Sequence, residues 1–425
     1  MKEKNSVREG YKLTELGEIP VEWDIQRLGE VAEIIMGQSP ESKYYNEEGK
    51  GVPFFQGKTE FGEIYPIIKK WCTNPTKISK YNDVLVSVRA PVGDVNINNI
   101  KEACIGRGLA AIRQTRKSHY GYLFYVLKVN KSNLEKISQG STFTAISSSD
   151  LQNLLIPLPP LPEQKKIAEI LSTVDEQIEQ TEQLIEKTKE LKNGLMQRLL
   201  TKGIGHTRFK KTELGEIPEE WEVKRLIDIA NESKNAISDG PFGSNLKISD
   251  YINDPQVPVL QGKNITTNKF VWEDIRYISY EKANELERSI VKEGDILLTK
   301  IGTVGCVAII DNLRGFKKAV IPANLLKITP NNNKINKYFL YYILLFSSNR
   351  IKELASQTAQ PALSLKVIKP FKIQVPPLDE QEKIVNILLN IDNKIDHYES
   401  RKHLLQQLKK GLMQKLLTGK IRVKV

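Results

Sequence analysis

Hydrophobic positions follow two different periods along the chain, and the change between them divides the sequence into four segments. Residues 158–204 and 375–425 carry apolar side chains at spacings of three and four, which predicts two amphipathic helices. The stripe consists of Ile167, Leu171, Val174, Ile178, Ile185, Leu195 and Leu199 in the first, and of Ile384, Leu388, Ile391, Ile395, Leu405, Leu412 and Leu416 in the second. Each helix can run about 40 residues, or roughly 60 Å. A helix this long with one apolar stripe needs a partner, and we expect the two to pack on each other.

The ends and the middle of these helices carry specific signals. Pro162 suits a first helical turn, and Asp379 followed by Glu382 predicts a capping box. Three polar residues, Thr181, Thr188 and Lys192, interrupt the first stripe midway. They weaken the seam, and they either specify the register of the helix pair or form a binding surface for another subunit.

The remaining segments, residues 1–157 and 205–374, show short β-branched runs between Gly, Pro, Asn and Asp clusters. The expected strands include Val84–Val88, Ile296–Leu298 and Val307–Ile310, and the expected buried helices include Leu123–Leu127 and Leu340–Leu345. The predicted fold class is therefore mixed α/β (α+β), with two such domains separated by two long helices.

An internal repeat relates the two halves of the chain. Four blocks of the first half return in the second half in the same order: Thr14–Leu28 as Thr212–Leu226, Val52–Lys58 as Val257–Lys263, Asn82–Gly93 as Gly294–Gly305, and Pro159–Leu171 as Pro376–Leu388. The helical copies stay in register, whereas the α/β copies share a skeleton and differ in their loops. Neutral drift would have reduced the similarity of the two helical copies as well. We therefore interpret the α/β copies as one scaffold that presents two different surfaces, with Trp23 and Trp221 as packing anchors.

The charge of the chain indicates a polyanionic partner. Its formal net charge is +12 and its pI is about 9.2, and lysine and arginine gain affinity for phosphates by releasing condensed counterions. The excess of positive charge is spread along the chain, with +3 in residues 1–162 and +6 in residues 203–378. Shaped basic surfaces are expected rather than a basic tail.

Targeting and cysteine signals are weak. The longest apolar run, Tyr338–Phe346, is about half of what a bilayer crossing needs, and the charged N-terminus lacks a signal-peptide core. Cys72, Cys104 and Cys306 are widely spaced without a CxxC pair, so we expect reduced, mostly buried thiols and neither disulfides nor a zinc site. We expect a cytoplasmic protein with no membrane contact.

The common catalytic motifs are missing. The QGKT stretch at Gln56–Thr59 does not match a phosphate-binding loop, since Val52 stands where glycine is required. No Asn/Asp-Pro-Pro-Tyr/Phe loop for a flipped adenine and no Gly-rich loop for a methyl donor occur. The four histidines form no ligand-spaced cluster, and we expect solvated or capping roles for them. The sequence predicts no catalytic site, no metal site and no bound cofactor.

The repeated motifs resemble the specificity subunit of type I restriction-modification systems over the whole chain. They are the twice-used TELGEIPxEW opening, the GDIL-type strand before Val-Gly, and the (L/V)PPLxEQxxI start of a helix that ends in GLMQ(R/K)LLT. The resemblance implies that residues 1–157 and 205–374 are target-recognition domains, each reading half of a bipartite DNA sequence. It implies that residues 158–204 and 375–425 form an antiparallel coiled coil. It also implies two modification subunits that carry S-adenosylmethionine, and restriction subunits that use ATP and Mg²⁺.

A bipartite reader needs base-edge contacts at two sites, and Arg, Lys, Asn and Gln suit the edges of guanine and adenine. The candidate DNA-binding residues are Lys58, Thr59, Arg89, Arg107 and Thr144 in the first domain, and Lys263, Asn264, Lys300, Asn324 and Gln360 in the second. A solvated surface residue is the competing interpretation for each of them.

Two other functions compete with this interpretation. The stronger is a tandem DNA-binding regulator or structural adaptor that works without a methyltransferase partner. The weaker is a fused single-chain endonuclease, which the missing motifs and the fully repetitive length disfavour.

Overall fold

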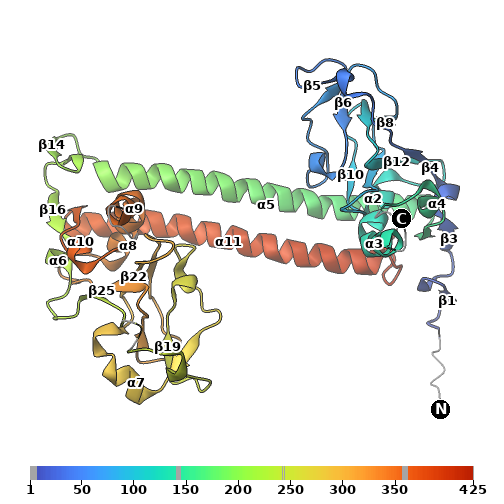
Figure 1. The fold of residues 1–425 in the computed structure, drawn as a ribbon. Helices are drawn as coiled ribbons and strands as arrows, with labels where there is room; N and C mark the ends of the chain where they lie inside the picture. The colour runs from blue at the N-terminus through green and yellow to red at the C-terminus, as the bar shows by residue number, and fades with distance from the viewer. Residues whose placement is uncertain (1–6, 140–144, 242, 244, 357–361, 425) are drawn as a thin grey trace, which may run out of the picture. The chain divides into compact units, whose positions relative to one another are not determined.

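The computed structural model describes residues 7–139, 145–241, 243, 245–356 and 362–424, which form two compact units (Figure 1). Unit 1 contains residues 1–183 and 399–425, and unit 2 contains residues 184–398. Each unit therefore holds one α/β domain and a part of each long helix, which confirms the predicted fold class. The division into four segments by residue range stays a prediction.

Unit 1 contains a four-stranded sheet of order β10-β9-β12-β4 and a five-stranded sheet of order β5-β7-β6-β11-β8. A hairpin, β1-β2, and a two-stranded ribbon, β3-β13, complete its strands. The strands are β1 Tyr11–Thr14, β2 Gly17–Pro20, β3 Asp24–Arg27, β4 Ala32–Met36, β5 Tyr45–Asn46, β6 Val52–Phe55, β7 Trp71–Cys72, β8 Ile78–Lys80, β9 Val84–Ser87, β10 Val95–Ile97, β11 Glu102–Ile105, β12 Leu109–Gln114 and β13 Leu155–Leu158. The shorter helices are α1 Leu28–Val31, α2 Tyr120–Val129, α3 Lys131–Gln139 and α4 Ser148–Gln152, with 3-10 turns at Ser42–Tyr44 and Lys58–Glu60.

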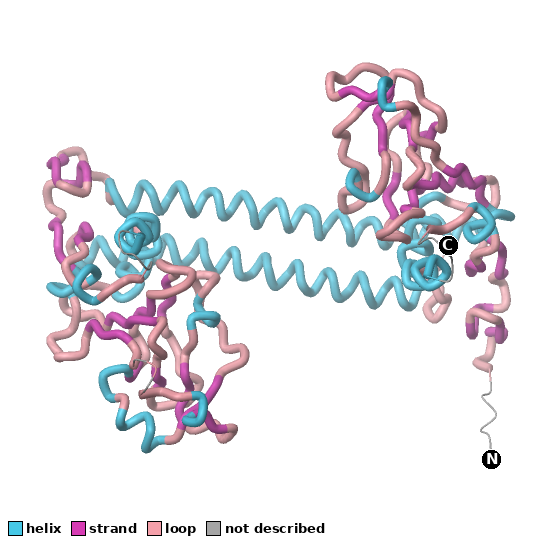
Figure 2. Tube along the Cα trace, viewed as in Figure 1, coloured by secondary structure: helices cyan, strands magenta, loops and turns pink. Residues whose placement is uncertain are grey.

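Unit 2 repeats this plan, with short strands and helices beside the long helices (Figure 2). Its sheets have the orders β17-β25-β22-β23 and β18-β20-β19-β24-β21. Its strands are β14 Phe209–Thr212, β15 Gly215–Pro218, β16 Glu222–Arg225, β17 Ile237–Asp239, β18 Tyr251–Ile252, β19 Val257–Val259, β20 Arg276–Ile278, β21 Ile290–Val291, β22 Ile296–Thr299, β23 Val307–Ile309, β24 Ala319–Val320, β25 Leu325–Ile328 and β26 Lys372–Val375. Its shorter helices are α6 Leu226–Ile229, α7 Tyr280–Glu285, α8 Lys337–Phe346, α9 Ser348–Ser356 and α10 Leu365–Ile368, with 3-10 turns at Ile248–Asp250, Gly262–Ile265 and Glu287–Ser289. The expected strands β9, β22 and β23 and the expected helices α2 and α8 are confirmed.

The two long helices are α5, Leu161–Lys202, and α11, Leu378–Leu416. Pro162 lies in the first turn of α5, as expected. The predicted capping box at Asp379 is wrong, because α11 already begins at Leu378. The backbone N–H of Gln381 donates to the carbonyl of Pro377 at 3.0 Å, so Asp379 lies inside the first turn rather than at its cap.

The apolar stripe faces the packed side of each helix. Ile167 and Leu171 of α5 and Ile384 and Leu388 of α11 are completely buried. In unit 1, Lys402 bonds Glu182 while Lys409 pairs with Asp175. Residue numbers fall along α11 as they rise along α5, so these helix segments run antiparallel.

The polar interruptions are part of the packed face. Thr181 and Thr188 are buried, and each hydroxyl donates at 2.6 Å to the carbonyl four residues earlier in α5. These bonds satisfy the hydroxyls without a partner on α11. Lys192 is ion-paired with Asp392.

Both predicted tryptophan anchors are completely buried, and each also makes a polar contact with a long helix. In unit 1, Trp23 Nε1 donates to Glu163 Oε2 at 3.0 Å, and Arg422 Nε donates to the other oxygen of Glu163 at 2.7 Å. Glu163 is 3% exposed, so the indole and the guanidinium compensate a buried carboxylate.

Unit 2 makes the equivalent contact with a histidine in place of the arginine. Trp221 Nε1 donates to Glu380 Oε2 at 2.9 Å, and His206 Nε2 lies 2.9 Å from Glu380 Oε1. The expected solvated or capping role is therefore wrong for His206, because the carboxylate holds its ring in a half-buried position.

Candidate nucleic-acid interface

Several loops meet at one end of the sheets in unit 1. The backbone N–H of Gln38 donates to Ile105 at 3.0 Å, and that of Gly106 donates to Phe55 at 2.8 Å. Gly108 closes the group with a bond from its N–H to the carbonyl of Gln56 at 3.2 Å. Loops from three parts of the sequence thus form one surface, as expected for a loop-presenting scaffold.

Arg107 lies at the centre of this surface, and its side chain is exposed. Its backbone N–H donates to Ser39 Oγ at 3.1 Å. A Cβ atom on Gly108 would lie 2.5 Å from the carbonyl oxygen of Gln56, so glycine permits this close approach. The loop is therefore fixed by its backbone, while the guanidinium remains available to a ligand.

Lys58 and Thr59 lie in the neighbouring 3-10 turn. Glu60 holds the turn, because its Oε2 accepts from the N–H groups of Gln56 and Gly57 at 3.1 and 2.9 Å. The Thr59 hydroxyl donates to the other oxygen of Glu60 at 2.7 Å. Both candidates are exposed at the edge of a rigid turn.

Asp94 restrains Lys58. Its carboxylate lies 2.6 Å from both Lys58 Nζ and Lys131 Nζ. Burial acts to raise the pKa of Asp94, but the bonds to Lys131 and Lys58 hold it below its ordinary value. The Lys58 ammonium is therefore held beside Asp94, and a phosphate or a base edge would meet it at that place.

Arg89 is exposed and forms an isolated bridge with Ala145. The N–H of Val88 donates to the carbonyl of Gly108 at 2.9 Å, which places Arg89 close to the loop of Arg107. Thr144 lies outside the described residues. The structure thus brings four of the five candidates of the first domain to one end of the fold.

The second domain uses the equivalent turn differently. Asn264 is buried: its Oδ1 accepts from the N–H of Gln261 at 3.0 Å, and its Nδ2 donates to the carbonyls of Val271 and Glu273 at 2.9 and 2.8 Å. Its amide stabilises the loop, as the Glu60 carboxylate does in the first domain. Lys263 beside it is exposed, with Nζ 3.5 Å from Asp274.

Lys300 is also buried, and its Nζ lies 2.7 Å from Asp239 Oδ2. Burial acts to raise the pKa of Asp239, but the Lys300 ammonium and the nearby Arg288 guanidinium hold it below its ordinary value. Lys300 thus anchors the start of the loop after β17. Its backbone N–H donates to Asn324 at 2.8 Å, which joins the two candidates.

Asn324 is half-exposed beside the 3-10 turn of Lys263, and a Cβ atom on Gly262 would lie 2.7 Å from its amide nitrogen. Gln360 lies outside the described residues.

Sequence reasoning missed Ser39, Glu60 and Asp239, which position the candidates. Glu60 follows the repeated block Val52–Lys58 by two residues, which is a sequence signal, whereas Ser39 and Asp239 lie between repeated blocks and have none.

Three further features of the described residues concern metal binding, membrane crossing and the cysteines. Its His, Cys, Asp and Glu residues form no cluster that could hold a metal ion. None of its helices is both long enough and apolar enough to cross a membrane. The three cysteines are buried and unpaired, as expected.

Two loop-presenting α/β domains, two long helices and a net charge of +12 are the features expected of a tandem recognition protein with a polyanionic ligand. The model of the type I restriction modification DNA specificity domain matches residues 20–190 and 218–410, and the chain belongs to this family. It is the non-catalytic specificity subunit of such a system, which agrees with the interpretation drawn from the repeated motifs and not with the regulator alternative.

Relatives of known assignment agree with the family match. The type I restriction enzyme MjaVIII specificity subunit of Methanocaldococcus jannaschii is 31% identical over 419 residues, which cover 96% of this chain and 94% of that protein. The putative MjaX specificity subunit of the same organism is 47% identical over 194 residues, or 45% of each chain. A crystal structure of a type I S subunit from M. genitalium superposes with a TM-score of 0.62 at 20% identity, covers 98% of each chain and confirms the fold.

Proposed function

We propose that the two α/β domains read the two halves of a bipartite DNA target, each through the loop surface described above. The observation that carries the proposal is the contrast between the copies. The same turn is held by Glu60 in one and by Asn264 in the other, while the exposed side chains around it differ. A common scaffold with different exposed donors is what two different half-sites require.

The proposed readers are the candidates whose side chains are exposed or half-exposed. In the first domain they are Lys58, Thr59, Arg89 and Arg107, with Thr144 as a further member. In the second domain they are Lys263 and Asn324, with Gln360 as a further member. Asn264 and Lys300 belong to the site as residues that position the loops, because their polar atoms are bonded inside the domain.

We further propose two modification subunits for each chain, together with restriction subunits. Each unit contains one copy of the same helix pairing, with Asp175 and Lys409 in unit 1 and Asp392 and Lys192 in unit 2. Each also contains one tryptophan–glutamate contact. Two equivalent surfaces can bind two copies of one partner. S-adenosylmethionine, ATP and Mg²⁺ would be bound by these partners, in the cytoplasm.

Methylation assays test this proposal. The purified chain alone should neither bind S-adenosylmethionine nor methylate plasmid DNA, and both activities should appear when a modification subunit is added. Sequencing of the modified bases should then give two constant half-sites around an unread spacer. Methyl transfer by the isolated chain, or a single continuous target, would contradict the proposal.

A further inference from the structure

An open groove of about 1140 Å³ lies in unit 2 between the segment before β17, residues 285–292 and α10. Five basic and two acidic side chains line it, with three small polar ones. The basic residues are Lys234, Arg288, Lys292, Lys327 and Lys369, the acidic ones Glu285 and Glu287, and the small polar ones Ser233, Asn235 and Ser238. Basic side chains therefore outnumber acidic ones in the groove, and none of the candidates predicted from sequence lies in it.

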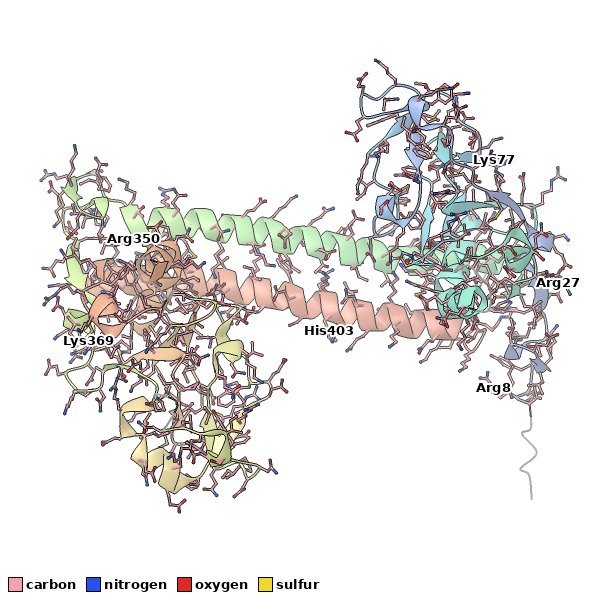
Figure 3. The ribbon with its side chains drawn as sticks, viewed as in Figure 1. Arg8, Arg27, Lys77, Arg350, Lys369 and His403 are labelled. Atoms are coloured by element: carbon pink, nitrogen blue, oxygen red, sulfur yellow. The ribbon has the colours of Figure 1, made fainter. Side chains whose placement is uncertain are left out.

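Three of these cations are available to a ligand. Lys234, Lys292 and Lys369, the last of them labelled in Figure 3, have no carboxylate within ion-pair distance among the residues that the structure describes. Arg288 is bonded to Asp239, and Lys327 lies 3.7 Å from Asp295. Unpaired cations around a concave surface attract anions.

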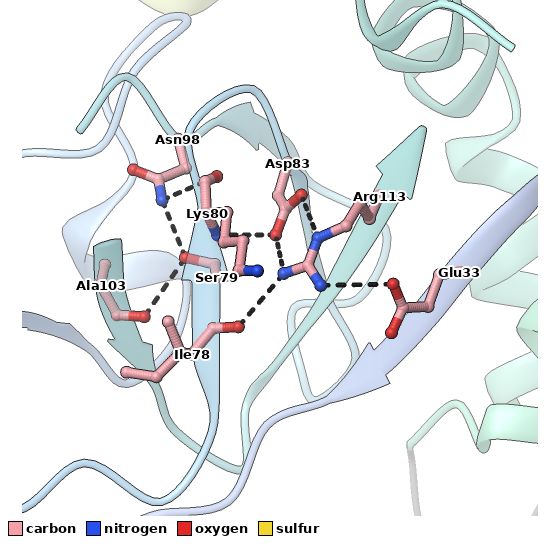
Figure 4. A network of polar contacts seen from close by, with 8 residues as sticks. All are labelled: Glu33, Ile78, Ser79, Lys80, Asp83, Asn98, Ala103 and Arg113. Carbon is pink, nitrogen blue, oxygen red and sulfur yellow. Dashed lines mark hydrogen bonds and ion pairs between the residues drawn. The ribbon is translucent and has the colours of Figure 1, made fainter. Parts of the chain in front are cut away.

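At the equivalent place in the first domain, an arginine is compensated by two carboxylates. Arg113 Nη2 donates to Asp83 Oδ2 at 2.9 Å, and Arg113 Nη1 donates to Glu33 at 3.2 Å (Figure 4). Glu33 and Arg113 are paired across β4 and β12. One guanidinium is thus shared between two carboxylates, so Arg113 adds no unpaired positive charge to this side of the domain.

The second domain has lost this neutralising pair. Ala236 and Thr329 occupy the positions of Glu33 and Arg113, and the Thr329 hydroxyl donates to Asp295 at 2.6 Å. Lys327, on β25, is buried beside the same carboxylate. Because Arg113 and Glu33 are replaced together, the basic character of the groove comes from its own lysines and Arg288.

The chemistry of the groove favours nucleic acid over a protein partner. Only Ile237, Ile290 and Leu365 contribute apolar side chains to it, whereas protein interfaces have apolar centres and are depleted in lysine. Lysine, arginine, serine and asparagine side chains are the usual donors to phosphate oxygens. The groove therefore resembles a backbone-binding surface.

Its position joins it to the proposed reading loops. Asp239, at the end of β17, bonds Lys300 with one oxygen and Arg288 of the groove with the other. β17 is only three residues long, or about 10 Å. This length corresponds to about three base-pair steps along a strand, so one duplex can contact both surfaces.

We propose that this groove binds the DNA phosphate backbone beside the half-site that the second domain reads. The inference rests on the proposed function and deepens it. Phosphate contacts fix the protein on the duplex without adding sequence information. The groove would thus contribute to the salt-dependent part of the affinity.

Salt titrations of DNA binding test the groove. The full chain is assembled with its modification subunit. Its affinity is measured for a duplex that contains the sequence it methylates and for a duplex that lacks this sequence. The triple variant K234Q/K292Q/K369Q should reduce the slope of log affinity against log salt by about 2 to 3. It should weaken binding to both duplexes by the same factor, and the complex should still methylate the same sequence.

A matched variant, K210Q/K211Q/K224Q, removes the same charge from β14 and β16 of the same unit and should leave the slope nearly unchanged. Equal loss of slope in both triple variants would overturn the proposal, because net charge alone would then explain it. An unchanged slope together with loss of the modification subunit would identify the groove as a protein-binding surface and also overturn it. Failure of the unsubstituted complex to methylate a bipartite target would instead refute the proposed function.

Discussion

Lys192 of α5 and Asp392 of α11 form an ion pair of 2.6 Å, and both side chains are only 15% exposed. Asp392 also accepts a hydrogen bond from the Tyr342 hydroxyl at 2.7 Å. The same contacts recur in unit 1, where Asp175 pairs with Lys409 and accepts from Tyr125. Lys192 therefore does not merely weaken the seam. It fixes the register of α5 against α11 in unit 2, and it connects both helices to the α/β domain.

The ion pair predicts an asymmetry between single and double substitutions. K192M leaves Asp392 largely buried without its cation and should destabilise unit 2 by about 1–3 kcal/mol. The double variant K192M/D392L removes both charges and should recover most of that loss. Thermal unfolding of the three proteins measures the difference.

An exposed pair in the same unit supplies the control. Lys269 and Asp396 are about half exposed, so K269M should change stability by less than about 1 kcal/mol. A double variant no more stable than K192M would show that the pair is not an isolated electrostatic contact.

The long helices were the most predictable part of the fold, because an apolar stripe that persists over many helical turns is a strong signal for a packed helix. The buried candidates were not predictable. Lys300 resembles any surface lysine in the sequence, and its burial depends on Asp239, 61 residues earlier. Asn264 likewise looks like an exposed loop residue until the carbonyls of Val271 and Glu273 are placed around it. Such pairings depend on tertiary contacts that no local pattern encodes.

Asp239 predicts a pH dependence of stability. Its folded-state pKa lies below its ordinary value, so its contribution is complete above the unfolded pKa of about 3.9 and is lost as the pH falls through the lower folded value. D239N should therefore lower the melting temperature of the chain at pH 6–7. The difference from the unsubstituted protein should shrink below about pH 4. The exposed D274N variant should show no such difference, and a constant effect of D239N at every pH would exclude the ionised carboxylate as its cause.

We expect substitution of Arg107 to change the recognition of one half-site only. R107A should weaken recognition of one half of the target by about 1–3 kcal/mol if the guanidinium makes a bidentate base contact. Lys101 is an exposed cation at the opposite end of β11, so K101A should leave the target unchanged. Sequencing of methylated sites in the assembled complex measures both variants.

Exchange of a whole domain tests the same division. Replacing residues 205–374 with the corresponding domain of a relative should alter only the other half-site. Changes in both halves after either the exchange or R107A would show that the domains do not read independently.

The helices predict the spacing between the half-sites. The boundary between the two units falls within α5, between residues 183 and 184, and within α11, between residues 398 and 399. Four residues inserted in α5 after Ile185 and before Lys192 would add about 6 Å of rise and rotate the following residues by about 40°. A matching insertion in α11 after Glu399 preserves both lysine–aspartate pairs.

If α5 and α11 set the spacing, the doubly inserted protein should methylate the same two half-sites with a spacer one or two base pairs longer, because the added rise is close to two base-pair steps along the duplex. The half-sites must also lie on compatible faces of a duplex that turns once in roughly 10 base pairs, so activity should fall while specificity for each half-site is retained. Insertion in α5 alone displaces Lys192 from Asp392 and should cost stability as well as activity. Sequencing the methylated sites decides the matter: an active enzyme with an unaltered spacer would show that the helices do not determine the distance.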